Sequence, residues 1–210
     1  MTSHVTPLRP RRTKFRALAA AGLVLGTGTT IVLASWTDSS FVTGIFALGS
    51  FGIEASVNGA NSWYDDEDDL IFTVNPTTVR PGDTHYAPIA LRTKADSMAA
   101  LVTLNGAIND GDAAVFNALR YRVVESTTCN SSAFTGASTY VVGSNTTASA
   151  LATGSAPDAI ALPAAASLPG AAKTYCFEIA LPDTSANWTN ANLPNKTAAA
   201  RWKFTAQSGS

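Results

Sequence analysis

Few side chains in this sequence can do chemistry. The histidines are His4, in a basic leader, and His85, which stands beside Tyr86 in a strand-like run. Acid–base and nucleophilic catalysis need a base within hydrogen-bond reach of its partner, and one isolated histidine offers no such pair. The chain also lacks an HExxH zinc motif, a G-x-S-x-G nucleophile motif and a phosphate-binding loop. We therefore expect no catalytic residue, no metal, no cofactor and no enzyme activity.

Residues 65–69 (DDEDD) form the strongest local concentration of charge. Five adjacent carboxylates could supply hard oxygen ligands to Ca²⁺. Calcium loops, however, place their ligands at alternate positions and bend at a glycine, and this run does neither. We favour a solvated hairpin tip, with Trp63 and Tyr64 packing its base, and keep calcium binding as the alternative.

Residues 1–34 have the pattern of a secretory signal peptide. A basic cluster precedes residues 17–34, which carry no charge. Val32 and Ala34 suit positions −3 and −1 of a cleavage site, so we expect a cut after Ala34 or after Ser35. Cleavage would release the chain outside the cell, either free or at the cell surface.

Two alternatives for this leader stay open. An uncleaved membrane anchor is disfavoured by the glycines and threonines that dilute the apolar stretch. The pair Arg11–Arg12 allows twin-arginine export in place of the general secretory route. By either export route, we expect the protein to contact the membrane only before its leader is cleaved.

The predicted mature chain, residues 35–210, is acidic. The leader takes 5 of the 14 basic residues and none of the 15 acidic ones, which leaves a formal net charge of −6. An acidic chain does not favour nucleic-acid binding. About 175 residues are enough for one domain with a substantial core.

The mature chain favours short strands. Strand-like runs are separated by Gly, Pro, Asn and Asp, and a turn is expected at Arg80–Pro81–Gly82–Asp83. One short helix is expected after Asp112, and residues 144–170 read as loop with a short strand near Ile160. At least eight runs at this spacing predict an all-β antiparallel sandwich. The runs are FGIEASVNG, DLIFTVNP, HYAPIALRT, AALVTLNG, LRYRVVES, STYVVGS, KTYCFEIAL and AARWKFTAQ.

Two cysteines, Cys129 and Cys176, remain after the leader. An even count in an exported chain predicts one disulfide. It would close a loop of about 47 residues and contribute about 4 kcal/mol by restricting the unfolded chain. The alternative is a pair of unpaired, buried thiols.

Three motifs, taken in order, resemble a known family. The segment ASWTD contains Trp36, the segment IFALGSFGIEA contains Phe46 and Phe51, and the segment VRPGD ends at Asp83. Together they resemble the TasA/camelysin family of SipW-dependent exported bacterial proteins, over roughly residues 20–105. The two cysteines and the Ala-rich segment resemble its actinobacterial branch.

This resemblance implies a jelly-roll-like β-sandwich that a SipW-type signal peptidase processes. It further implies a secreted structural subunit that assembles with itself into biofilm-matrix fibres outside the cell or on its surface. A monomeric secreted binding module of the same fold is the alternative. A secreted protease is the third reading, which the absent metal motif disfavours.

Residues 35–48 are the expected assembly strand. Side chains alternate between the two faces of a strand, and this segment has apolar residues on both, so it should be buried. It can pair as an edge strand of its own subunit or complete the sheet of the next subunit. Head-to-tail addition of the second kind is open and produces filaments. The residues assigned to assembly are Trp36, Phe41, Ile45, Phe46 and Phe51.

Overall fold

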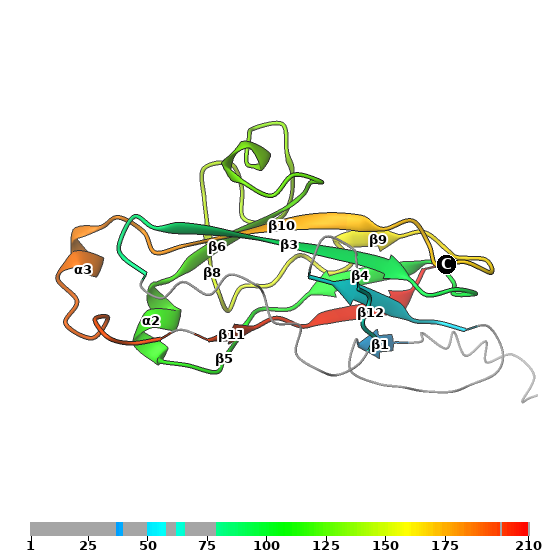
Figure 1. Ribbon diagram of the computed structural model, residues 1–210, viewed down its shortest axis with the longest axis horizontal. Helices are drawn as coiled ribbons and strands as arrows, with labels where there is room; N and C mark the ends of the chain where they lie inside the picture. The colour runs from blue at the N-terminus through cyan, green and yellow to red at the C-terminus, as the bar shows by residue number, and fades with distance from the viewer. Residues whose placement is uncertain (1–36, 40–49, 58–61, 66–78, 198, 210) are drawn as a thin grey trace, which may run out of the picture. The chain divides into compact units, whose positions relative to one another are not determined.

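The structure, a computed structural model, describes residues 37–39, 50–57, 62–65, 79–197 and 199–209. In Figure 1 the described strands form layers of antiparallel sheet. The chain is an all-β antiparallel sandwich, which confirms the predicted fold class.

The larger sheet has six strands in the order β2-β3-β10-β6-β7, with β8 also paired to β6. Every pairing in it is antiparallel. Its strands are β2 (Ile53–Ser56), β3 (Thr84–Thr93), β6 (Arg120–Glu125), β7 (Thr139–Val142), β8 (Ser149–Ala150) and β10 (Lys173–Ala180).

The smaller sheet has four strands in the order β1-β12-β4-β9. They are β1 (Thr37–Ser39), β4 (Ala100–Leu104), β9 (Ile160–Leu162) and β12 (Phe204–Ser208). A separate two-stranded ladder joins β5 (Ile108–Asn109) to β11 (Ala200–Arg201).

The core lies between the two sheets. Val102 and Leu104 of the smaller sheet and Tyr175 and Phe177 of the larger sheet belong to one buried cluster. In each strand these two residues are separated by one position, so their side chains lie on the same face, which points into the core. The intervening Cys176 belongs to a second, smaller cluster on the other face of the larger sheet.

A tight turn leads into β3. The amide of Asp83 donates to the carbonyl of Arg80 over 2.9 Å, and the amide of Arg80 donates to Asp83 Oδ2 over 2.7 Å. Gly82 has φ +98°, a conformation that side-chain-bearing residues rarely adopt. The predicted turn is therefore confirmed.

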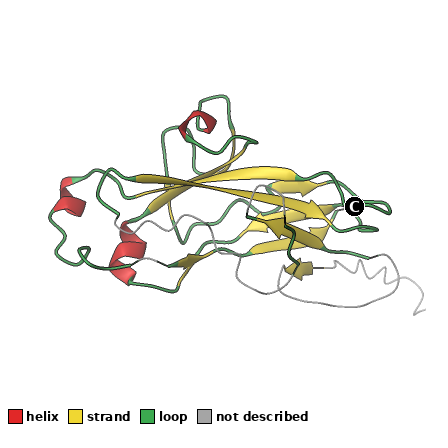
Figure 2. Ribbon diagram, viewed as in Figure 1, coloured by secondary structure: helices red, strands yellow, loops and turns green. Residues whose placement is uncertain are grey.

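The helices are short; α2 (Ala113–Ala118) and α3 (Ser185–Trp188) lie toward one end of the sheets, and η1 (Ser131–Ala133) lies in the loops outside the larger sheet (Figure 2). The expected helix is α2, and the Asp112 side chain accepts hydrogen bonds from the amides of Ala114 and Val115, as a capping residue should. The helices α3 and η1 were not expected.

Several expectations lie outside the described residues. The signal peptide 1–34, the strand expected in DLIFTVNP and most of the segment 35–48 are among them. Within the described ranges, no helix has both the length and the hydropathy needed to cross a bilayer.

Candidate functional site

The N-terminal strand β1 forms an edge of the smaller sheet. Figure 1 shows β1 beside β12, and β12 is its neighbour in the strand order. The pairing is antiparallel, with Thr37 opposite Gln207 and Ser39 opposite Thr205. The first and last described strands therefore lie side by side in the same sheet.

This pairing is short. Strand β1 has three residues, so it forms only a few ladder hydrogen bonds, each with a net contribution of about 0.5–1.5 kcal/mol. Strand β12 is held far better on its other side, where its five residues pair with β4 from Phe204 opposite Leu104 to Ser208 opposite Ala100. Removal of β1 would leave β12 in place.

Strand β12 is also held in place by the hydrophobic core. Phe204 and Ala206 point into the core and are almost fully buried. Without β1, the backbone N–H and C=O groups of β12 would form an unpaired sheet edge, which readily pairs with another strand. Loss of β1 would thus expose an edge of β12 that can accept a strand.

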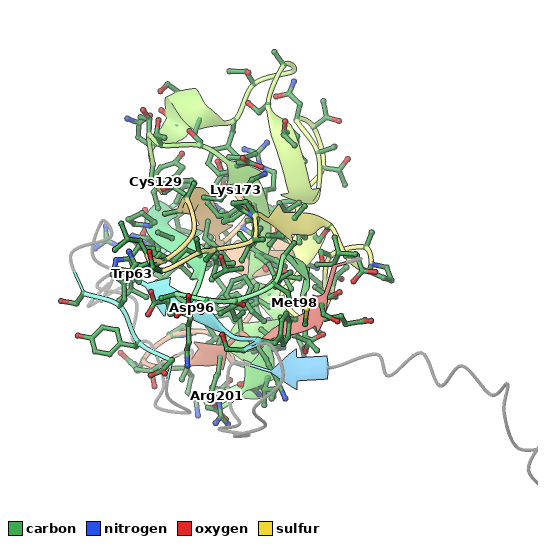
Figure 3. All side chains as sticks on the ribbon, turned by 90° about the vertical axis from the view of Figure 1, so that its right-hand side faces the viewer. Trp63, Asp96, Met98, Cys129, Lys173 and Arg201 are labelled. Carbon is green, nitrogen blue, oxygen red and sulfur yellow. A yellow bond between two sulfur atoms is a disulfide. The ribbon has the colours of Figure 1, made fainter. Side chains whose placement is uncertain are left out.

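The chain is anchored again from Ser50 onward. The amide of Met98 donates to the carbonyl of Ser50 over 3.2 Å, and the amide of Gly52 donates to Ser97 Oγ over 3.1 Å. Phe51 packs against the main core of its own subunit. Figure 3 labels Met98, whose amide forms the first of these bonds. Residues 50–52 therefore belong to the body of the subunit.

Of the predicted assembly and cleavage residues, the structure describes only Phe51. Phe51 lies in its own subunit. The remaining ones lie outside the described residues: Ala34, Ser35, Trp36, Phe41, Ile45 and Phe46.

A lobe bound by a disulfide rises from the outer face of the larger sheet (Figure 1). We define it as residues 126–138, between β6 and β7. Cys129 at its base (Figure 3) is bonded to Cys176 of β10, which confirms the predicted disulfide. Phe134 of the lobe lies 5.9 Å from Tyr86 and 6.4 Å from Tyr140, measured between ring centroids. The sequence predicts no element between the runs LRYRVVES and STYVVGS, and Phe134 is the residue there that signals a second core.

An ion pair is buried beneath this lobe. Arg122 of β6 lies opposite Glu178 of β10, and its Nε and Nη2 donate to the two carboxylate oxygens over 2.8 and 2.7 Å. The guanidinium carbon also lies 4.9 Å from the centroid of the Phe134 ring. Burial, and then the negative charge of Glu178, raise the pKa of Tyr86 above its ordinary value. A bidentate pair of this kind fixes the two strands and the lobe relative to each other.

The residues considered for catalysis or metal binding do not form a site in the described part of the chain. His85 lies opposite Ile179, and its Nε2 is buried with no hydrogen-bond partner among the described residues. Within those same ranges, no three His, Cys, Asp or Glu side chains gather as metal ligands.

Only the start of the acidic run is described. Asp65 forms an ion pair with Lys94. Just before it, the Trp63 ring lies 3.9 Å from the guanidinium carbon of Arg92, whereas Tyr64 is 46% exposed. Trp63 thus packs on Arg92 of β3 and Tyr64 is exposed, whereas residues 66–69 of the run lie outside the described residues.

The chain matches no protein-family model and no curated protein sequence.

Proposed function

We propose that this protein is a secreted, non-enzymatic structural subunit that polymerises outside the cell by exchange of its N-terminal strand. The observation that supports this most directly is the three-residue edge strand β1 on the well-anchored strand β12. The resemblance of the ASWTD, IFALGSFGIEA and VRPGD segments to TasA/camelysin proteins supports the same reading.

In this proposal β1 has two equivalent positions. In a free subunit it pairs with its own β12, and in a fibre the same residues pair with β12 of the next subunit. Both states satisfy the same backbone groups, so exchange requires little net energy from β1 itself. The larger gain would come from residues 40–48, whose apolar side chains would be buried at the joint.

In this proposal, strand exchange involves only the residues before Ser50. Residues before Ser50 can leave the subunit while Phe51 stays against its own core. Each subunit then donates one strand and accepts one, which is a heterologous, open contact. Such contacts give filaments of indefinite length, the form expected of a matrix fibre.

Processing would control when assembly starts. We propose that a SipW-type signal peptidase cuts after Ala34 or Ser35 and so frees the donor segment. Before the cut, the leader would hold that segment at the membrane. Mass measurement of the secreted protein should give an N-terminus at Ser35 or Trp36.

A cross-linking experiment tests strand exchange. One population carries Thr37→Cys and a second carries Gln207→Cys, since these positions are cross-strand partners. Cα atoms of paired antiparallel residues lie within the range that a disulfide can span, about 4.4–6.8 Å. When the two populations are mixed, covalent dimers joined through these two positions should accumulate as fibres grow.

The matched control replaces Thr37→Cys by Ser39→Cys, which lies opposite Thr205 and is out of register with position 207. It should give far fewer cross-links. A single chain carrying both Thr37→Cys and Gln207→Cys should close on itself and stay monomeric until a reductant is added. Fibres without the matched cross-link, or no fibres from any mixture, would refute the proposal.

A further inference from the structure

The indole ring of Trp188 is an exposed side chain that the fibre proposal does not use. It is 61% exposed, the most exposed aromatic ring among the described residues. A single exposed apolar side chain is ordinary by itself. What distinguishes Trp188 is that its ring is held in one orientation.

One hydrogen bond holds this ring, and another holds the backbone of the same residue. Its Nε1 donates to Asp183 Oδ1 over 2.6 Å. The residue ends α3, and its amide donates to the carbonyl of the capping residue Thr184 over 3.0 Å. The indole is thus ordered before any ligand arrives, which lowers the entropic cost of binding to it.

The loop that carries Trp188 is itself anchored. The amide of Gly82 donates to the carbonyl of Leu181 over 2.8 Å, and the amide of Leu181 donates to the carbonyl of Asp83 over 3.1 Å. These bonds tie the loop to the turn before β3. In Figure 1, α3 lies beyond one end of the strands.

Apart from Asp183, the segment that carries the ring is polar and uncharged. Residues 184–195 carry no charged side chain and include four asparagines. The side-chain amide of Asn187 donates to the carbonyl of Pro182 over 2.8 Å, and Asn190 Oδ1 accepts from the amide of Asn192 over 3.0 Å. Carboxamides both donate and accept hydrogen bonds, so they match vicinal hydroxyl groups.

We propose that Trp188 is a stacking platform for a neutral polysaccharide. A pyranose ring offers an apolar C–H face that can lie on the indole, and a rim of hydroxyls that the nearby carboxamides and the Asp183 carboxylate can bind. A protein partner is less well matched, because a protruding Trp that anchors a protein interface is usually ringed by other interface side chains packed against it. The indole N–H is moreover already used by Asp183. This site does not depend on strand exchange.

Affinity electrophoresis of the secreted protein tests this assignment. Native gels contain laminarin, dextran or mannan, three soluble neutral polysaccharides, and a gel without sugar is the reference. At least one of them should retard the wild-type protein. Trp188→Ala should weaken the retardation about tenfold, and Trp188→Phe should lie between the two.

Tyr64→Ala is the matched control, since Tyr64 is the other aromatic side chain with a large exposed fraction in the part of the chain that the structure describes. Its retardation should equal that of the wild type. Circular dichroism should show all three variants folded, because both replaced side chains are exposed. Equal retardation of Trp188→Ala and wild type, or no retardation of the wild type in any of the three gels, would overturn the proposal. Fibre formation by Trp188→Ala stays as in the wild type, so the two proposals can fail separately.

Discussion

At the scale of single residues, two buried tyrosines differ in one hydrogen bond. The Tyr121 hydroxyl donates to the carbonyl of Thr153, whereas the Tyr175 hydroxyl is buried with no partner among the described residues. A buried, unpaired polar group costs about 1–3 kcal/mol. The two rings therefore predict opposite effects for the same Tyr-to-Phe change.

We expect Tyr175→Phe to raise the free energy of unfolding by about 1 kcal/mol. Tyr121→Phe should lower it by a similar amount, because it leaves the Thr153 carbonyl without its donor. Urea unfolding of the two variants beside the wild type measures both. A loss of stability in Tyr175→Phe would mean that its hydroxyl has a partner in solution.

The same tyrosines predict a loss of stability at alkaline pH. Burial raises the pKa of Tyr121 to about 12, against 10.0 for an ordinary tyrosine. Burial, and then the charge of Glu125, raise the pKa of Tyr175 as well. In the folded state both rings keep their protons where the unfolded chain has lost them. Their contribution to the free energy of unfolding is therefore complete below about pH 10. The contribution of Tyr121 is lost as the pH rises toward about 12.

Unfolding curves collected across this alkaline range should show stability falling by about 1.4 kcal/mol per pH unit for each ring. The variant with both Tyr121→Phe and Tyr175→Phe should show a flatter decline. An equally steep decline in that variant would assign the effect to other groups.

At the scale of elements, the disulfide fixes the lobe 126–138 to the central strand β10. Replacing both Cys129 and Cys176 by Ala should lower the free energy of unfolding by about 4 kcal/mol, the entropic value for a loop of this length. The fold should survive, because the lobe has its own small cluster and the main core lies on the other face of the sheet. Guanidinium unfolding of the variant, and of the reduced wild type, measures the loss. A change below about 1 kcal/mol would contradict the entropic account.

The sequence predicts those helices and strands that a few neighbouring residues determine. Strand β3 follows a Pro-Gly turn, and α2 begins at a capping aspartate, so both could be placed from a few neighbouring residues. Strands β5 and β11 have two residues each, too few to show any period. The run AARWKFTAQ was expected as one strand, and the structure divides it between β11 and β12.

Pairing partners could not be predicted in the same way. The contact of β1 with β12 joins positions 37 and 207, and nothing in either segment specifies the other. The fixed orientation of Trp188 likewise depends on a bond to Asp183 that spacing alone does not reveal. The disulfide was predictable because only two cysteines remain after the leader.

At the scale of the whole molecule, the fibre proposal predicts that the donor segment can be damaged without unfolding the subunit. Ile45→Asp or Phe46→Asp should cost several kcal/mol at each joint, since burial of a large apolar side chain contributes about 1.5–3 kcal/mol and a buried charge adds a penalty. We expect soluble, folded monomers, as seen by electron microscopy and circular dichroism.

Leu168→Asp is the control for this prediction. Leu168 is 76% exposed and lies far along the chain from the donor segment, so this apolar-to-acidic change should leave fibres intact. If instead the Ile45 and Phe46 variants unfold, the segment belongs to the core of its own subunit, and the exchange reading fails.

The pairing of the first strand with the last also sets an order of events during synthesis. Positions 37 and 207 are made 170 residues apart, which at about 5–20 residues per second is a delay on the order of ten seconds or more. By residue 180 every strand of the six-stranded sheet exists, whereas the four-stranded sheet still lacks β12. Under the fibre proposal, each nascent chain would therefore carry its donor strand long before its acceptor strand, and it could not receive a neighbour's strand until its own translation was nearly complete. The direction of translation would then restrict polymerisation to finished subunits, in addition to the control exerted by cleavage of the leader.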